Sequence, residues 1–364
     1  MPGLFSPFTL KDTTLRNRIV VSPMCQYMSQ EGVANDWHQV HYTSMARGGA
    51  GAVIVEATAV SPEGRISWGD AGLWNDEQAA ALEPIVAAIR KWGAAPGIQL
   101  AHAGRKASAN RPWEGDDHIP AGEPNAWQPI APSAIPFGAN LPRTPQEMSL
   151  QDIARVQQDV VRAAERARDV GFEWLQLHLA HGYLAQNFWS TYSNSRTDHY
   201  GGSAENRGRY LLETLSAVRK VWPENRPLAA RFSVVEFDGN DEQMLLESIA
   251  LLKKMKQAGL DTVDISIGFN TPTANIPWGP NFLGDIAGRV LSETGLPGTT
   301  SWYIDGPKGA DQLIRDGKID FASIGRPFLA DPHWAYKAAK ELGVEDAAWK
   351  TLPAPYAHWL ARYR

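Results

Sequence analysis

Short apolar segments alternate with longer amphipathic segments along most of the chain. Each short segment is rich in apolar residues and is bounded by glycine, proline or polar residues, which is typical of strands buried on both faces of a parallel sheet. Eight of them are predicted strands: Arg18–Met24, Ala52–Ala59, Gly97–His102, Glu173–His178, Leu228–Val234, Thr262–Ile267, Gly298–Trp302 and Phe321–Gly325.

The segments between the predicted strands have the periodicity of amphipathic helices. In 241–259, for example, apolar residues recur at helical spacing and Gly259 ends the run. Ser149 and Ser203 are predicted N-caps of the helices that follow them, and Asp76 is placed similarly at the start of the second helix. Eight strands that alternate with helices predict an α/β protein with a (β/α)8 TIM barrel.

The chain has 364 residues, whereas a typical barrel of this kind needs about 250. The surplus lies mainly in long loops after strands three and six, 104–146 and 268–283, and in a C-terminal tail, 347–364. Loops that follow strand C-termini are where barrel enzymes keep their sites. No internal repeat or linker divides the chain, so 1–364 is predicted to be a single domain.

Composition and charge exclude several classes of protein. Apolar residues make up 43% and charged residues 21% of the chain, too many apolar residues for disorder. The net charge of −5 gives no basic footprint for nucleic acid or an acidic membrane. No apolar run is long enough to span a bilayer, and the N-terminal segment lacks the pattern of a secretory signal. A single cysteine, Cys25, cannot form an internal disulfide. We therefore expect a cytoplasmic protein.

Candidate chemistry collects where the predicted strands end. Gly325 and Arg326 suit a phosphate, because a glycine permits close approach of the backbone and a guanidinium binds phosphate; a tight turn with a surface arginine is an equal alternative. Cys25 is an inert buried thiol or a hydrogen-bond partner of a cofactor. The residues at the strand ends are Cys25, Ala57, Gln99, His178, Arg231, Trp302, Gly325 and Arg326.

The sequence His178-Leu-Ala-His181-Gly-Tyr183 has three interpretations. The histidines could bind a metal with His102 as third ligand, as in a metal-dependent hydrolase or aldolase. They could instead donate hydrogen bonds to a carbonyl or phenolate oxygen, with Tyr183 placed to deliver a proton. They could also be core histidines that are satisfied by hydrogen bonds. A glycosidase is a further rival, but Glu56 has no convincing carboxylate partner.

Seven motifs make the chain resemble the Old Yellow Enzyme family of flavin-dependent ene-reductases, in its thermophilic-like class. The resemblance covers essentially the whole chain, and the motifs occur in the family's order. They are SPMCQYM (22–28), ARGGAG (46–51), IQLAHAGRKA (98–107), HLAHGYL (178–184), SNSRTDHYGGSAENRGRY (193–210), SIGRP (323–327) and LPAPYAHWLARYR (352–364). The glycines and arginines of 200–210 are interpreted as structural, tying a loop to a helix.

This resemblance implies noncovalent FMN at the strand C-termini, with NADPH or NADH as reductant. Arg231 would lie near N1 and O2 of the flavin, and Gly325 and Arg326 would hold its phosphate. The other residues expected to contact FMN are Pro23, Met24, Cys25, Ala57 and Gln99.

The resemblance also implies reduction of activated C=C bonds in enones, maleimides and nitroalkenes. His178 and His181 would bind the carbonyl or nitro oxygen, hydride would pass from FMN N5 to the β-carbon, and Tyr183 would protonate the α-carbon. Tyr27 would also bond the substrate oxygen, and Trp302 would wall the pocket. Trp359 in the tail would complete a neighbouring subunit's site, which implies a homodimer or a higher homo-oligomer.

One segment departs from the family pattern. Where the family offers a small residue or glycine beside the flavin phosphate, this chain has Tyr303-Ile304-Asp305. A carboxylate exposed near a phosphate would weaken its binding. Tyr303 is therefore not included among the expected FMN-binding residues.

Overall fold

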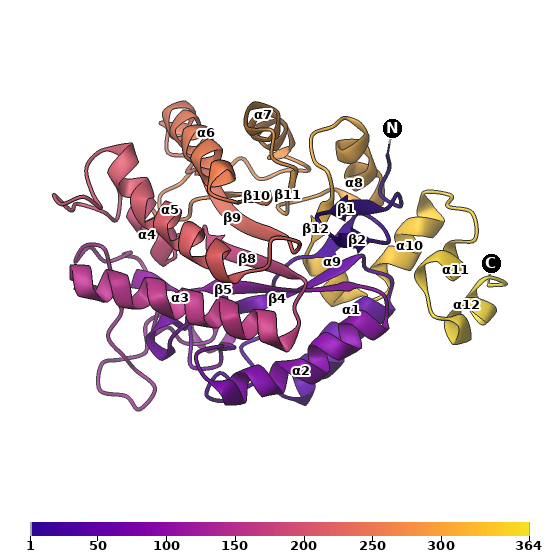
Figure 1. Cartoon of the computed structure of the whole chain (residues 1–364), viewed down its shortest axis with the longest axis horizontal. Coiled ribbons are helices and arrows are strands. Elements are labelled where there is room, and N and C mark those ends of the chain that lie inside the picture. The colour runs from indigo at the N-terminus through magenta and orange to yellow at the C-terminus, as the bar shows by residue number, and fades with distance from the viewer. Residues whose placement is uncertain (1, 364) are drawn as a thin grey trace.

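The computed structural model describes residues 2–363, so that Met1 and Arg364, the ends of the predicted domain, lie outside the described residues. Its main feature is a near-closed barrel of eight parallel strands in the order β11-β10-β9-β8-β5-β4-β3-β12 (Figure 1). The predicted (β/α)8 barrel is confirmed. The strands are β3 (Ile19–Val21), β4 (Ala52–Ala59), β5 (Ala95–Ala101), β8 (Trp174–Leu179), β9 (Leu228–Val235), β10 (Thr262–Ile267), β11 (Gly298–Thr300) and β12 (Ala322–Ile324).

Helices surround the sheet on its outer side (Figure 1). Those that follow barrel strands are α1 (Asp36–Arg47), α2 (Asp76–Lys91), α3 (Leu150–Val170), α4 (Leu184–Trp189), α5 (Ala204–Val221), α6 (Asp241–Gln257), α7 (Gly284–Thr294), α8 (Gly306–Arg315) and α9 (Arg326–Ala330). Three more, α10 (Trp334–Glu341), α11 (Ala347–Thr351) and α12 (Ala354–Leu360), lie at one end of the molecule, and the last two form the predicted tail. Within residues 2–363, no helix combines the length and the apolar character needed to cross a membrane.

The predicted helix starts are confirmed for α3 and α5. The side chain of Ser149 accepts a hydrogen bond from the backbone N–H of Asp152, and Ser203 accepts one from Asn206. The start of α2 differs by one residue: Asn75 is the N-cap and accepts from the N–H of Gln78, whereas Asp76 is the first helical residue. An asparagine caps as well as an aspartate, because either side-chain oxygen reaches the free N–H groups of the first turn.

The strand ends determine which residues are free to form the site. β3 stops at Val21 and β11 at Thr300, earlier than the predicted ends at Met24 and Trp302. Residues 22–25 and 301–304 are therefore loop rather than strand. Successive side chains in a strand point to opposite faces of the sheet, whereas those of a loop need not. Several consecutive residues of these loops can therefore face the same cavity.

The N-terminal end of the barrel is closed by a hairpin. β1 (Phe8–Leu10) and β2 (Thr13–Leu15) pair antiparallel. Leu15 belongs to a buried cluster with residues at the beginnings of the barrel strands, and Phe8 and Leu10 pack against it. The other members are Val20, Ala52, Ile54, Ala95, Trp174 and Ala229 in the strands and Phe321 just before β12. This apolar cluster fills the N-terminal end of the barrel, whereas the cavity described below opens at the C-terminal end.

The two long loops lie over that C-terminal end and bond to each other. The loop after β5 contains η2 (Gly104–Lys106), η3 (Pro112–Glu114), β6 (Ile130–Ala131) and β7 (Gln146–Glu147). The buried guanidinium of Arg105 donates to the backbone oxygen of Asn270, in the loop after β10. The ammonium of Lys106 donates to the oxygens of Phe269, at 2.7 Å, and His181, at 2.9 Å. These bonds fix the walls of the space above the barrel.

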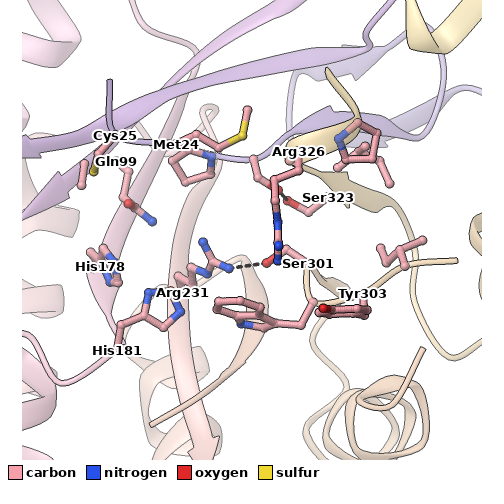
Figure 2. Close-up of a pocket in the computed structure, with 18 of the residues that line it drawn as sticks. Met24, Cys25, Gln99, His178, His181, Arg231, Ser301, Tyr303, Ser323 and Arg326 are labelled. Atoms are coloured by element: carbon pink, nitrogen blue, oxygen red, sulfur yellow. Dashed lines mark hydrogen bonds between the residues drawn. The ribbon is translucent and has the colours of Figure 1, made fainter. Parts of the chain in front are cut away.

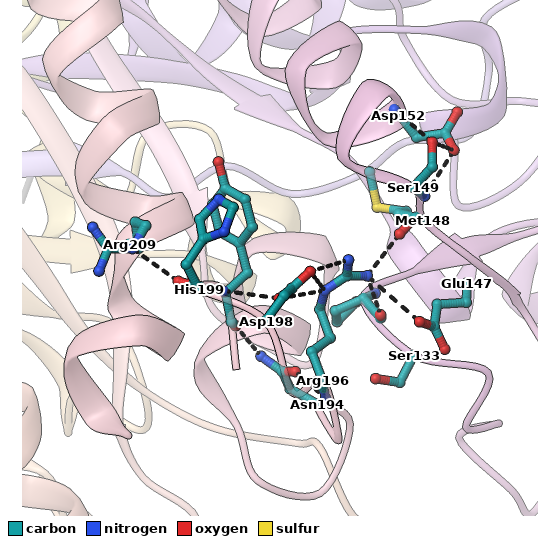
Figure 3. Close-up of polar contacts among 12 residues, drawn as sticks. Ser133, Glu147, Met148, Ser149, Asp152, Asn194, Arg196, Asp198, His199 and Arg209 are labelled. Atoms are coloured by element: carbon teal, nitrogen blue, oxygen red, sulfur yellow. Dashed lines mark hydrogen bonds and ion pairs between the residues drawn. The ribbon is translucent and has the colours of Figure 1, made fainter. Parts of the chain in front are cut away.

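The motif at 193–210 makes contacts within the scaffold (Figure 3). Arg196 pairs with Asp198 at 2.6 Å and donates to the backbone oxygens of Pro132 and Met148. Asn194 donates to the backbone oxygens of Phe188 and Tyr200. The segment thereby joins the loop after β8 to the long loop after β5. Within 200–210, the part interpreted as structural, Arg207 donates to the backbone oxygens of Trp189 and Gly202.

Candidate active site

A cavity of about 500 Å³ opens at the C-terminal ends of the strands, within the usual size range of ligand pockets (Figure 2). Of the fourteen residues predicted for the site, twelve line it: Pro23, Met24, Cys25, Ala57, Gln99, His178, His181, Tyr183, Arg231, Trp302, Gly325 and Arg326. Sequence reasoning missed seven lining residues: Ser22, Ser301, Tyr303, Ile304, Ser323, Ile324 and Pro327. Most of these are neighbours of predicted residues, so the proximity to a strand end is the signal that could have found them.

The turn after β8 brings His178 and His181 together. His181 has φ +62° and Gly182 φ +70°, so two successive left-handed residues reverse the chain. Only glycine fits at 182, because a Cβ there would lie 2.5 Å from the backbone oxygen of Phe269. As a result the two imidazole rings lie 4.9 Å apart between centroids, nearly perpendicular at 85°.

Both histidines are neutral hydrogen-bond donors. Burial, followed by the charge of Arg231, holds the pKa of each imidazole well below its ordinary value. The backbone N–H of Ala180 donates to Nδ1 of His178 at 3.3 Å, so the proton of this neutral ring is on Nε2. A neutral imidazole with a free N–H can bind the oxygen of a ligand without carrying a buried charge.

Tyr183 lies next to these rings and retains its proton. Its ring centroid is 4.9 Å from that of His178, at an angle of 86°. Burial raises the pKa of the phenol well above its ordinary value, and the neighbouring Cys25 acts in the same direction. The phenol is therefore a donor near neutral pH, and it is positioned to pass a proton to a bound molecule.

Arg231 is a buried cation that lies between the two sides of the cavity (Figure 2). Its Nε is 3.3 Å from a carboxylate oxygen of Asp264, and its Nη2 donates to Ser301. Burial raises the pKa of the Asp264 carboxyl to about 6. Asp264 and Ser301 hold the guanidinium in place, where it can stabilise negative charge that develops on a ligand.

Cys25, Ala57 and Gln99 form an uncharged side of the cavity. Burial raises the pKa of the Cys25 thiol well above its ordinary value, so Cys25 is a thiol and not a nucleophilic thiolate. The side-chain amide of Gln99 donates to Gln176 at 2.7 Å, which fixes its orientation. This side of the cavity offers hydrogen-bonding groups to the polar edge of a planar ligand.

Gly325 and Arg326 lie on the opposite side, together with Tyr303 (Figure 2). Gly325 lines the cavity next to Arg326, and a Cβ at this position would have the sulfur of Met24 as its nearest neighbour, at 3.4 Å. The guanidinium of Arg326 is 5.6 Å from the centre of the Tyr303 ring. Tyr303 thus belongs to the cavity wall, contrary to its exclusion from the predicted site, while Asp305 is exposed and is not a lining residue.

Two predicted residues do not line the cavity. Tyr27 is half-buried near Cys25 and Tyr183, and burial followed by these neighbours raises the pKa of its phenol. Trp359 is 71% exposed on α12, in the tail. In a single chain it is available to another molecule rather than to its own cavity.

The alternative of a metal-dependent barrel lacks its ligand set. Within residues 2–363, no three His, Cys, Asp or Glu side chains are grouped so that they could hold a metal ion. His102 is buried and does not line the cavity that contains His178 and His181. Among the charged groups around His102, Glu63 has the largest effect on the pKa of its imidazole.

The two sides of the cavity suit different parts of one ligand. Arg326 and the open backbone at Gly325 match a phosphate, whereas Gln99, Cys25 and Ala57 match the polar edge of a flat ring system with Arg231 beside it. The fold and the site thus fit the class of flavin-binding barrel oxidoreductases.

Comparison with known proteins identifies the family. The chain belongs to the NADH:flavin oxidoreductase / NADH oxidase family, whose model matches residues 3–345. An NADPH dehydrogenase of Geobacillus thermodenitrificans (strain NG80-2) is 41% identical over 347 residues, which cover 95% of this chain and 96% of the relative. An NADPH dehydrogenase of Bacillus subtilis (strain 168) is 39% identical over 355 residues, with 97% of each chain covered.

Solved structures place the chain among the Old Yellow Enzymes. Morphinone reductase in complex with tetrahydroNAD has a TM-score of 0.77 and 27% identity, covering 95% of this chain and 92% of its own. An old yellow enzyme homologue from Zymomonas mobilis has a TM-score of 0.76 and 26% identity, with 98% and 99% covered. The protein is an FMN-dependent oxidoreductase that uses a nicotinamide reductant, and the donor set of its cavity fits FMN.

Proposed function

We propose that this flavin oxidoreductase reduces activated C=C bonds in small molecules, namely enones, maleimides and nitroalkenes. The observation that carries the proposal is the group of His178, His181 and Tyr183 on one wall of the cavity, two neutral imidazoles beside a protonated phenol. When bound, FMN supplies a hydride to the β-carbon of the alkene.

The residues of the two sides hold the cofactor in this proposal. Gly325 and Arg326 bind the phosphate, and Arg231 lies beside the part of the ring that becomes negative on reduction. The rest of the ring contacts Pro23, Met24, Cys25, Ala57 and Gln99. NADPH or NADH and the alkene occupy the same cavity in turn.

The histidines bind the carbonyl or nitro oxygen of the alkene. Two N–H donors withdraw electron density from the conjugated bond and stabilise the negative charge that reaches this oxygen as the β-carbon is reduced. Tyr183 then delivers a proton to the α-carbon. Tyr27, whose phenol is also protonated, assists in binding the oxygen, and Trp302 closes the pocket over the substrate.

The proposal extends to a single domain over 1–364 that assembles as a homodimer or a higher homo-oligomer in the cytoplasm. The support for assembly is the tail at 347–364, which exposes Trp349, Trp359 and Tyr363 by 52%, 71% and 70%. Tryptophan and tyrosine are enriched among the residues that contribute most to binding at protein interfaces. Trp359 would then complete the cavity of a neighbouring subunit.

Substitution of the three residues tests the assignment. His178→Ala with His181→Ala should abolish the absorbance change that phenols cause in the oxidised holoenzyme and should sharply slow alkene reduction. Tyr183→Phe should slow alkene reduction by about 10²- to 10⁴-fold, as for the loss of a general acid, and leave flavin reduction by NADPH nearly unchanged. Unaltered phenol binding and alkene turnover in the double variant would contradict the proposal.

A further inference from the structure

Behind the cavity wall, Ser266 connects two residues that face the cavity. Its hydroxyl oxygen is 2.7 Å from Nε2 of His181 and accepts a hydrogen bond from the indole N–H of Trp302 at 2.8 Å. Ser266 lies in β10 and is fully buried. It does not line the cavity, so it can influence a ligand only through His181 and Trp302.

The direction of these hydrogen bonds follows from the chemistry of the three groups. An indole N–H can only donate, so Trp302 occupies one lone pair of the Ser266 oxygen. The remaining hydrogen of the serine needs an acceptor, since a buried unpaired hydroxyl is costly. Within residues 2–363, Nε2 of His181 is the one further atom that the hydroxyl contacts at hydrogen-bond distance.

His181 is neutral, because burial holds the pKa of its imidazole well below the ordinary value, and so it carries a single ring proton. If Nε2 accepts from Ser266, that proton is on Nδ1. Nδ1 has no hydrogen-bond partner within the described part of the chain, and His181 lines the cavity. His178 carries its proton on Nε2 for a comparable reason, because the backbone N–H of Ala180 occupies its Nδ1.

We propose that Ser266 is a positioning residue that fixes His181 in the tautomer with its proton on Nδ1. The cavity then presents two N–H groups at once, Nε2–H of His178 and Nδ1–H of His181, and no unprotonated ring nitrogen that would repel a ligand oxygen. The role of these donors in substrate binding rests on the proposed function, whereas the tautomer itself does not.

β9 offers a matched control at the same level of the sheet. Ser233 is paired in register with Ser266 and is also fully buried. Its hydroxyl bonds to His181 too, but it accepts from the backbone N–H at 3.2 Å and donates to the backbone oxygen of Ile267. Ser233→Ala therefore removes an equivalent hydroxyl without touching the imidazole.

The test is ¹⁵N NMR of the FMN-bound protein labelled at histidine, with the His181 signals assigned by their loss in His181→Asn. Wild type and Ser233→Ala should show a protonated Nδ1 and an unprotonated Nε2. Ser266→Ala should show a mixture of tautomers or a protonated Nε2, and Ser266→Thr, which keeps the hydroxyl, should return the wild-type pattern. Phenol binding to Ser266→Ala should weaken by about 3- to 10-fold, the value of one hydrogen bond.

A wild-type protein with the His181 proton on Nε2 would overturn the inference, as would Ser266→Ala with an unchanged tautomer. These results are independent of catalysis. If the tautomer responds as expected but the protein reduces no alkene, the inference about Ser266 stands and the proposed function fails.

Discussion

Replacement of Glu56 by glutamine should change how the stability of the protein depends on pH. Glu56 lies in β4, next to Ala57 of the cavity, and is fully buried. One carboxylate oxygen accepts from the backbone N–H of Gln26 at 2.7 Å, and the other accepts from the phenol of Tyr42 at 2.8 Å. His38 is 3.5 Å away, but burial lowers the pKa of this imidazole to about 4, so it supplies no positive charge near neutral pH.

Burial raises the pKa of the Glu56 carboxyl from 4.5 to about 7, in spite of these hydrogen bonds. A difference of this size corresponds to roughly 3 kcal/mol between the two protonation states. Because the pKa is higher in the folded chain than in the unfolded chain, the protonated carboxyl favours folding. That stabilisation is fully present below about pH 4.5 and is lost as the pH rises through about 7.

In Glu56→Gln the group cannot ionise, so this loss should disappear. At low pH the variant should be about as stable as wild type, because the protonated carboxyl and the amide each have one accepting oxygen and one donating group. Between pH 4.5 and 8 the free energy of unfolding of wild type should fall relative to the variant by roughly 3 kcal/mol. Asp70 and Asp264 titrate in both proteins and largely cancel in this difference.

The assay is urea unfolding of FMN-saturated protein across this pH range. Glu83→Gln, which changes an exposed carboxyl on α2, is the control and should remain at a constant offset from wild type. Parallel curves for wild type and Glu56→Gln would refute the reasoning, because Glu56 would then not titrate in the folded protein near neutral pH.

Two further predictions concern the ends of the site. Arg326→Ala should weaken FMN binding by about 10- to 100-fold, as for a charge-assisted hydrogen bond; FMN fluorescence titration measures this, and Arg315→Ala on the exposed face of α8 should bind as wild type does. Trp359→Ala should raise the KM for alkenes by about 2- to 10-fold through the loss of one aromatic contact, while Trp349→Ala should not; equal effects of the two tail variants would argue against a specific role of Trp359.

Much of the fold was predictable because parallel strands buried on both faces have a simple pattern. All eight strands of the barrel were found, and the C-terminal ends that gather the chemistry followed from their order. The exact residues at which the strands end were harder to predict from the sequence. The serine and proline at 22–23 are compatible with a strand end at Val21, but the apolar pattern does not show that β11 stops at Thr300, because Trp302, Tyr303 and Ile304 of the loop are more apolar than the strand itself.

Several residues of the site that the sequence did not predict contact the cavity residues from neighbouring segments of the fold. Asp264 and Ser266 lie inside β10, where they contact Arg231, His181 and Trp302 from neighbouring segments. Only the register between strands reveals those contacts. Tyr303 was excluded because its type is unusual, yet its left-handed backbone, with φ +50°, lets the ring pack beneath Arg326 at the cavity wall.

The central claim is that FMN in this cavity passes electrons from NADPH to an activated alkene. Its most direct test is the absorbance of the purified protein under anaerobic conditions, first with NADPH and then with 2-cyclohexenone. The account predicts flavin bands that bleach with NADPH and return in proportion to the cyclohexanone formed. A protein that does not bind FMN, or whose reduced flavin remains bleached in the presence of the enone, would contradict it.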